Sequence, residues 1–274
     1  MTRSRGLGAG AAPLNKGRRT ADNTSVNIAL AALVLPPALA FGSFVNVVAA
    51  RVPLRQSVSK PRSRCGACGS EIQARDNIPI LSYLMLRGRC RSCHTRISPL
   101  YPAVEAVTAL LVMACVLVFG ATAYAALAAF FVVVLVTLSA ADLRYRLVPN
   151  RIVIPAAVIV LVAHTAIDPS AEWLLSALGA SAFLLVAALA YPKGLGMGDV
   201  KLALLLGAML GRDVALALML GFLAALVPSA VLFVRHGSQA RKMAIPLVPF
   251  LALGAVVALF TGGAILDWYL GLTG

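Results

Sequence analysis

Long, uncharged, apolar runs recur along this chain and constrain its fold more than any other feature. Each run has about 20 residues, the length that an α-helix needs to cross the hydrocarbon core of a bilayer. Only 12% of the residues are charged, against roughly 25% in soluble domains. Strands of a membrane barrel are shorter, about 10 residues, and alternate in polarity. The sequence therefore predicts an all-α polytopic membrane protein.

About eight transmembrane helices are expected, with a polar loop after the first. Proline, glycine and charged residues mark the boundaries, and Pro36 and Pro37 should kink the first helix. The sixth span is short enough to be tilted or to enter the bilayer without fully crossing it. The expected spans are 26–50, 101–119, 122–141, 152–168, 173–191, 200–211, 214–234 and 246–267.

Three regions are expected along the chain. Residues 1–24 are rich in Gly, Ala, Arg and Thr without apolar periodicity, which predicts a disordered tail. Residues 25–100 contain the first helix and the polar loop, and residues 101–274 contain the remaining helices.

The placement of lysine and arginine predicts the orientation of the chain. If the loop 51–99 faces the cytoplasm, the inside segments hold 18 of the 24 basic residues, and five in the tail run against the rule. The net charge of +14 therefore indicates orientation in a lipid bilayer and not nucleic-acid binding. The loop also lacks the interleaved aromatic residues of a nucleic-acid platform.

Two Cys-x-x-Cys pairs in this loop predict a structural zinc site. The pairs are Cys65 with Cys68 and Cys90 with Cys93, a spacing typical of four thiolates around one Zn²⁺. Disulfides are the alternative, but a cytoplasmic loop is kept reduced. His94 could replace one ligand, although a surface role is the simpler interpretation.

Two isolated aspartates predict the chemistry. Asp142 ends one apolar run, and Asp199 follows the glycines of Gly194-Leu195-Gly196-Met197-Gly198 at the start of another. With the loop 51–99 inside, both lie at the cytoplasmic face. Each alone could be a helix end at the headgroups, yet acids retained near a bilayer usually have a function.

Two carboxylates brought close together cannot both ionise, so one is held protonated. Such a pair activates a water for attack on a peptide carbonyl and protonates the leaving nitrogen. The sequence contains no His-Glu-x-x-His or Gly-x-Ser-x-Gly motif for another hydrolytic mechanism. Lys201 could stabilise an oxyanion, but an interfacial anchor is the preferred interpretation.

Several further segments after about residue 40 form an ordered set together with both Cys-x-x-Cys pairs. They are Gly42-Ser43-Phe44-Val45-Asn46-Val47-Val48, Arg51-Val52-Pro53, Asn77-Ile78-Pro79-Ile80-Leu81-Ser82-Tyr83, Leu86-Arg87-Gly88-Arg89-Cys90, Tyr101-Pro102-Ala103-Val104-Glu105, the Asp142 segment with Val148-Pro149-Asn150, and Gly196-Met197-Gly198-Asp199-Val200-Lys201-Leu202. In this order, the set resembles the type IV prepilin leader peptidases, in the bacterial form that also N-methylates the product.

The resemblance implies that Asp142 and Asp199 are the catalytic aspartates of a plasma (inner) membrane peptidase. The implied substrates are prepilins or pseudopilins of type IV pilus or type II secretion systems, cut after glycine at the cytoplasmic face. It also implies methylation of the new N-terminus from S-adenosylmethionine by the region 25–100. Gly42, Asn46 and Glu105 are the implied contributors to methyl transfer, with helix contact or helix capping as alternatives. Gly196, Gly198 and Lys201 are expected to support the substrate.

Two alternatives stay open at this point. One is a peptidase without methyltransferase activity. The other is a proton- or ion-coupled transporter, whose acids usually lie near the bilayer midplane on broken helices. The sequence predicts neither the oligomeric state nor which pilin system is served.

Overall fold

The computed structural model describes residues 21–191, 194–237 and 245–273, with side chains from 26 onward and up to 265. Most of the predicted disordered tail, 1–24, lies outside this part, and the first helix begins at Ala21. The long helices are α1 Ala21–Arg51, α3 Leu100–Phe119, α4 Ala123–Tyr145, α5 Asn150–Ile167, α6 Glu172–Ala190, α7 Met197–Leu210, α8 Val214–His236 and α9 Val248–Thr273. The short ones are η1 Ala74–Asn77, α2 Leu81–Met85 and η2 Gly211–Asp213.

The predicted all-α membrane class is confirmed. Seven segments of the described chain are long and apolar enough to cross a membrane. The eight expected helices are all present, but α7 and α8 fall within one of these seven segments, Met197–His236. With 14 residues, α7 extends only about 21 Å, less than the roughly 30 Å hydrocarbon core.

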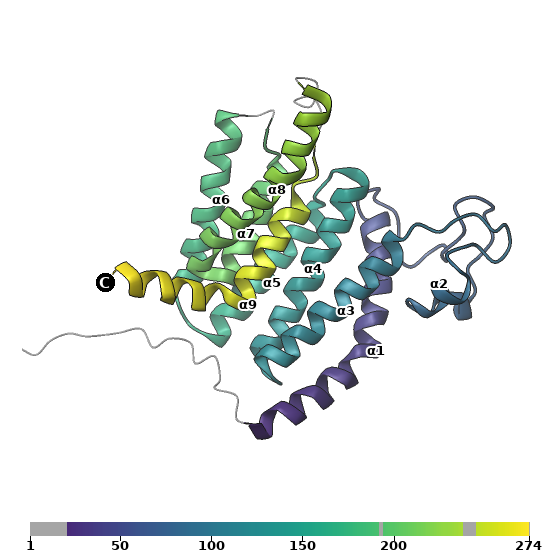
Figure 1. Cartoon of the computed structure of the whole chain (residues 1–274), viewed down its shortest axis with the longest axis horizontal. Helices are drawn as coiled ribbons and strands as arrows, with labels where there is room; N and C mark the ends of the chain where they lie inside the picture. Colours follow the sequence, from purple (N-terminus) through teal and green to yellow (C-terminus); the bar gives the residue numbers. More distant parts are fainter. Residues whose placement is uncertain (1–20, 192–193, 238–244, 274) are drawn as a thin grey trace, which may run out of the picture.

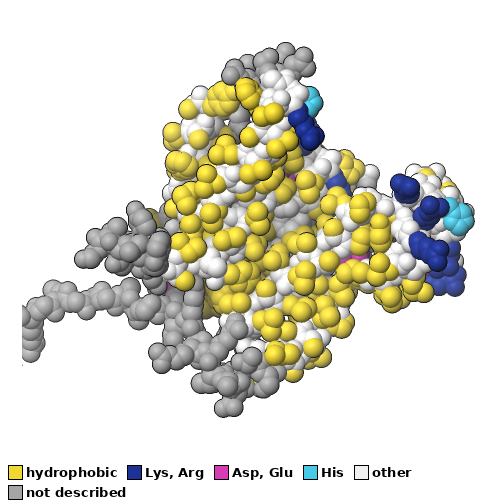
Figure 2. Space-filling model, in the orientation of Figure 1, with side chains coloured by type: hydrophobic (Ala, Val, Ile, Leu, Met, Phe, Trp, Pro, Cys, Tyr) yellow, Lys and Arg dark blue, Asp and Glu magenta, His cyan; other side chains and the backbone are white. Residues whose placement is uncertain are grey.

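The helices form one bundle, and the polar loop projects from it beside the end of α1 (Figure 1). Figure 1 also shows α1, which contains Pro36 and Pro37, changing direction along its length, as expected. Apolar side chains cover the visible face of the bundle, and Lys and Arg gather on the projecting loop (Figure 2). This distribution suits a bundle in lipid with its loop in water.

Glycines allow pairs of these helices to approach closely. A β-carbon on Gly42 of α1 would lie 2.7 Å from the Cα of Glu105 in α3. Gly207 of α7 packs directly on the backbone of Ala177 in α6, and Gly254 of α9 packs directly on α8. Small residues at such crossings are typical of membrane helices, whose association depends on close packing.

Candidate active site

Asp142 lies in the last turn of α4 and is buried. The helix ends at Arg146, which adopts a left-handed conformation (φ 53°) and donates its N–H to the Asp142 carbonyl at 2.8 Å. The carboxylate accepts a 3.1 Å hydrogen bond at Oδ2 from the backbone N–H of Val248, the first residue of α9. Asp142 is therefore held by the N-terminus of a helix more than 100 positions further along the chain.

Asp199 lies in the first turn of α7, where acids favour helix formation. Its Oδ2 accepts a 3.1 Å hydrogen bond from the Gly196 N–H, while its own N–H donates to the Gly196 carbonyl at 3.0 Å. This reciprocal pairing resembles a capping box, with Gly196 at the position before the helix. The aspartate thus holds the start of its own helix.

The structure brings the two aspartates together, although 57 positions separate them. Their carboxylates are close enough to interact electrostatically. Two contacts between the flanking segments hold this arrangement. Gly198 packs on Val148, and Lys201 Nζ donates to Asn150 Oδ1 at 2.9 Å.

One oxygen of each carboxylate remains for chemistry. Both aspartates use Oδ2 to accept a backbone N–H, and the described residues offer no hydrogen bond to either Oδ1. No fully buried polar side-chain atom in the described part lacks a partner, so neither Oδ1 is sealed off from its surroundings. Each aspartate therefore keeps one oxygen that no described residue occupies with a hydrogen bond.

The glycines before Asp199 differ in how closely they pack against neighbouring side chains. A glycine in such a motif can serve a positive φ or a close approach of the backbone to another group. None of Gly194, Gly196 and Gly198 is among the glycines with a positive φ. A β-carbon at Gly198 would lie 2.8 Å from Val148 Cγ2, whereas one at Gly196 would make only ordinary contact, 3.4 Å from Asp199 Oδ2. Close packing is therefore the requirement at Gly198.

A second cluster contains the four loop cysteines. The Sγ atoms of Cys65, Cys68, Cys90 and Cys93 all lie within 4.8 Å of one another, and all four are free. The Cys65 and Cys93 sulfurs are 3.8 Å apart. A tetrahedral ion with bonds of about 2.3 Å would separate its sulfurs by about 3.8 Å. The cluster therefore fits a metal ion.

The two cysteine turns have matching backbones. The N–H of Gly69 donates to the Cys65 carbonyl at 2.9 Å, and the N–H of His94 donates to the Cys90 carbonyl at 3.0 Å. Gly69 and His94 both have a positive φ. His94 thus occupies the turn position of Gly69 and is not part of the sulfur cluster.

Backbone N–H groups of Cys93 and Ser92 lower the pKa of the Cys90 thiol to about 6. A thiolate is the form that binds metal. Arg91 follows Cys90 directly in the sequence, but its guanidinium pairs with Asp76.

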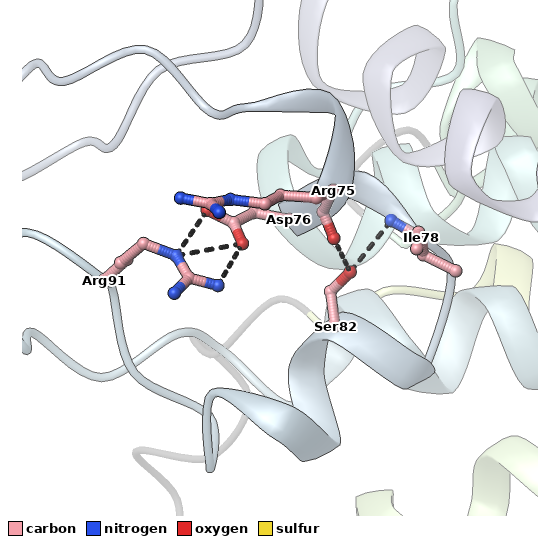
Figure 3. Close-up of polar contacts among 5 residues, drawn as sticks. All are labelled: Arg75, Asp76, Ile78, Ser82 and Arg91. Carbon is pink, nitrogen blue, oxygen red and sulfur yellow. Dashed lines mark hydrogen bonds and ion pairs between the residues drawn. The ribbon is translucent and has the colours of Figure 1, made fainter.

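The Arg91–Asp76 pair braces the loop (Figure 3). Arg91 Nη2 lies 2.6 Å from Asp76 Oδ1, and Arg91 Nε lies 2.9 Å from Oδ2. This hydrogen bonding lowers the pKa of the Asp76 carboxyl. Ser82 adds a second link, since its Oγ accepts from the Ile78 N–H and donates to the Arg75 carbonyl. These contacts connect η1 and α2 to the second cysteine turn.

A cavity of about 660 Å³ lies between this loop and the ends of α1 and α3. Its volume falls in the range of small-molecule sites, about 300–1,000 Å³. Asn46 and Glu105 line it, whereas Gly42 does not and instead lies at the α1–α3 crossing. The structure therefore brings two of the three residues suggested for methyl transfer into one cavity.

Glu105 and Asn46 differ in how their polar atoms are used. Glu105 is buried, and its Oε2 accepts a 2.7 Å hydrogen bond from the Ile80 N–H. No Lys or Arg of the described chain forms an ion pair with it. The Asn46 amide is already occupied: Nδ2 donates to the Tyr101 carbonyl at 3.0 Å, and Oδ1 accepts from Arg144 at 3.1 Å.

Sequence reasoning missed three contributors to these sites. No sequence pattern could have identified the Val248 N–H as a donor, because every residue except proline carries the same backbone group. In the sequence, Arg144 was only one of the basic residues that predict orientation, and Ile80 was only part of a segment that carries the family resemblance. Ile80 has a positive φ of 59°, which presents its N–H to Glu105.

The fold and the two sites define a polytopic membrane protein with a paired-carboxylate centre and a cysteine-bearing loop. Two family models match the chain: the bacterial peptidase A24 N-terminal domain over residues 37–119 and the type IV leader peptidase family over residues 129–234.

Several relatives are named prepilin leader peptidase/N-methyltransferase. The Bacillus subtilis (strain 168) protein is 36% identical over 85% of this chain and 94% of its own length. The Aeromonas hydrophila protein is 33% identical over 87% of this chain and 93% of its own length. The Myxococcus xanthus (strain DK1622) protein is 41% identical over 63% of this chain and 53% of its own length. No solved structure matches the chain.

The chain belongs to the type IV leader peptidase family. The predicted family resemblance is therefore confirmed.

Proposed function

We propose that this protein is a membrane-embedded aspartyl endopeptidase that removes the leader of prepilins or pseudopilins and then N-methylates the new N-terminus. The observation that supports the proteolytic half is the proximity of Asp142 and Asp199, each with one oxygen that accepts no hydrogen bond from the described residues. The relatives' name supports the same two activities. The family match favours this function over the transporter alternative.

The proposed mechanism uses one aspartate as base and the other as acid. The unprotonated carboxylate takes a proton from water, whose oxygen attacks the scissile carbonyl. The protonated partner then donates its proton to the leaving nitrogen as the C–N bond breaks. The hydrogen bonds to Val248 and Gly196 keep both carboxylates in place through these steps.

Replacing each aspartate by the uncharged asparagine tests the proposed peptidase activity. Asp142→Asn and Asp199→Asn should each abolish leader removal from a prepilin while the protein still accumulates in the membrane. Asp168→Asn is the matched control. Asp168 follows the last residue of α5, whereas the first residue, Asn150, is at the end of α5 that contacts Lys201 near the aspartate pair. Cleavage that survives in either of the first two variants would remove the proteolytic half of the proposal.

For methyl transfer, the cavity between the loop and α1 and α3 is the proposed site for S-adenosylmethionine and the new N-terminus. The cofactor supplies an electrophilic methyl group when bound. Glu105 is a buried carboxylate without a cation in the described chain, and such a group favours a cationic ligand. Its proposed role is to bind the substrate's α-ammonium group and accept its proton, freeing the nitrogen lone pair.

Glu105→Gln tests this role, because the amide keeps the shape and loses the charge. N-methylation, followed by mass spectrometry of the mature pilin, should fall at least about 100-fold, within the contribution of a general base. Leader removal should continue. A fully methylated product would exclude Glu105 as the base.

The cysteine cluster is proposed to bind one Zn²⁺ with a structural role, because four sulfur ligands leave no open position. The loop and both aspartates are proposed to face the cytoplasm, since the inside segments then hold most of the basic residues. In that orientation the loop stays reduced and able to bind metal.

A further inference from the structure

Arg144 connects the end of α4 to the ends of α1 and α3. Its Nη1 donates to the Asn46 carbonyl at 3.3 Å, and its Nη2 donates to Asn46 Oδ1 at 3.1 Å. Its guanidinium carbon lies 4.7 Å from the centre of the Tyr101 ring. Next to it, Tyr145 donates its hydroxyl to the Ala50 carbonyl at 3.1 Å.

The partners of Arg144 and Tyr145 form one wall of the cavity. Asn46, Ala50 and Tyr101 all line it. The Nη2 bond holds Oδ1 of the Asn46 side chain and the Nη1 bond holds the Asn46 backbone carbonyl, while Nδ2 of the same side chain points to the carbonyls of Tyr101 and Gly42. Arg144 thereby sets the positions of two lining residues without lining the cavity itself.

Arg144 faces away from the aspartate pair. Two residues along an α-helix correspond to a rotation of about 200°, so Asp142 and Arg144 lie on opposite sides of α4. The contacts agree, because Asp142 binds the N-terminus of α9 and Arg144 binds α1. The end of α4 is therefore a shared wall between the two sites.

We propose that Arg144 is a positioning residue for methyl transfer, although it lies two residues from a catalytic aspartate of the peptidase. It acts by holding Asn46 and Tyr101 in the cavity wall. This inference rests on the proposed assignment of the cavity to S-adenosylmethionine. A basic residue that only set membrane orientation would not need two hydrogen bonds and an aromatic contact.

Arg144→Met tests the proposal, because methionine keeps an unbranched apolar stem and removes the guanidinium. In the full-length protein in membranes, we expect KM for S-adenosylmethionine to rise or kcat of methylation to fall by about tenfold or more, since a 1 Å misplacement can lower a rate roughly 100-fold. Cleavage of the same prepilin should stay within about twofold. Arg151→Met is the matched control, because Arg151 is an exposed base near the same end of the bundle.

Arg144→Lys provides a second variant that keeps the charge. A lysine presents one nitrogen and cannot reproduce the planar fork of arginine, so methylation should recover only in part. If Arg144→Met does not accumulate in the membrane, the lysine variant decides. A raised KM or a lowered kcat of methylation with normal cleavage supports the proposal, and unchanged KM and kcat of methylation overturn it. An equal loss of cleavage and methylation in either variant would assign Arg144 to the peptidase or to the fold.

Photo-crosslinking of radiolabelled S-adenosylmethionine to the unaltered protein tests the cavity assignment separately from the role of Arg144. Labelling of α1, α3 or the loop together with normal methylation by Arg144→Met would overturn this inference alone. Labelling elsewhere would overturn the cavity assignment and the inference together.

Discussion

Gly198 and Val148 are in contact so close that position 198 has no room for a β-carbon, which would lie 2.8 Å from Val148 Cγ2 and 2.9 Å from its Cβ. Val148 follows Asp142, and Gly198 precedes Asp199. The contact therefore sets how near the two aspartate-bearing segments can come.

Gly198→Ala should separate the two carboxylates and reduce prepilin cleavage by about tenfold or more, because overpacking costs about 1–3 kcal/mol. Gly196→Ala is the control, since its β-carbon meets Asp199 only at ordinary distance, and it should cleave close to normally. Val148→Gly combined with Gly198→Ala should restore part of the activity. A time course of prepilin cleavage measures the activity of each variant. Equal losses of cleavage activity in Gly198→Ala and Gly196→Ala would contradict this explanation.

Val248→Pro should remove the hydrogen bond to Asp142 without breaking α9. Proline is well tolerated at the first position of a helix, where it lacks the N–H but has a suitable φ. A hydrogen bond to a charged group contributes about 1.5–3 kcal/mol, so cleavage should fall roughly tenfold or more. Val248→Ala removes apolar atoms but keeps the N–H, and it should retain more activity. The rate of prepilin cleavage by the Val248→Pro and Val248→Ala variants in membranes is the measurement that compares them.

Gly42→Ala should reduce methylation more than cleavage. Its β-carbon would lie 2.7 Å from the Cα of Glu105, so α3 must shift where Glu105 borders the cavity. Gly179→Ala in α6 is the control, because nothing lies within 4 Å of its added carbon. Mass spectrometry of the processed pilin gives both readouts. Full methylation with Gly42→Ala would show that this crossing tolerates displacement.

Metal removal should affect the loop and the cavity beside it. Elemental analysis of the purified protein should give about one zinc per chain, and none after Cys65 and Cys90 are changed to Ser. Methylation should then fall more than cleavage, because both cysteines line the cavity. Cys115→Ala should keep its zinc, since Cys115 is buried in the helical core. Intact disulfides and no metal would contradict the zinc site and the cytoplasmic loop.

Asp76→Asn should loosen the loop at neutral pH, where the lowered pKa keeps the wild-type carboxylate ionised. The Asp76 side chain is 10% exposed and accepts from Arg91 at both oxygens. Limited proteolysis should therefore cut the loop of this variant faster. Glu71→Gln removes a pair whose side chains are 84% and 48% exposed, and such surface pairs contribute little. Equal cutting rates in the two variants would contradict a bracing role for Asp76.

The sequence predicted the helices well because uninterrupted apolar runs of this length have few other structures available in a bilayer. It also predicted the cysteine cluster, since four thiols at this spacing need only local turns to meet. The aspartate pair was predicted from chemistry and family resemblance, not from pattern. Its proximity depends on contacts such as Gly198–Val148, which no periodicity encodes.

The remaining features depend on contacts between distant positions. Arg144 and Asn46 are 98 positions apart, and arginine at the end of a span serves as an orientation signal in any membrane protein. Gly196 and Gly198 are the same residue in the same motif, yet only the structure distinguishes the one that is packed against Val148. Tertiary packing therefore decides what each motif residue does.

The anchoring of Asp142 by the start of α9 also bears on how far the protein can be shortened. The peptidase family match ends at residue 234, so a fragment trimmed to that match would retain both aspartates. It would nevertheless lack the backbone donor that orients one of them. A minimal version of the enzyme must therefore extend at least into α9, whose first residue supplies this donor.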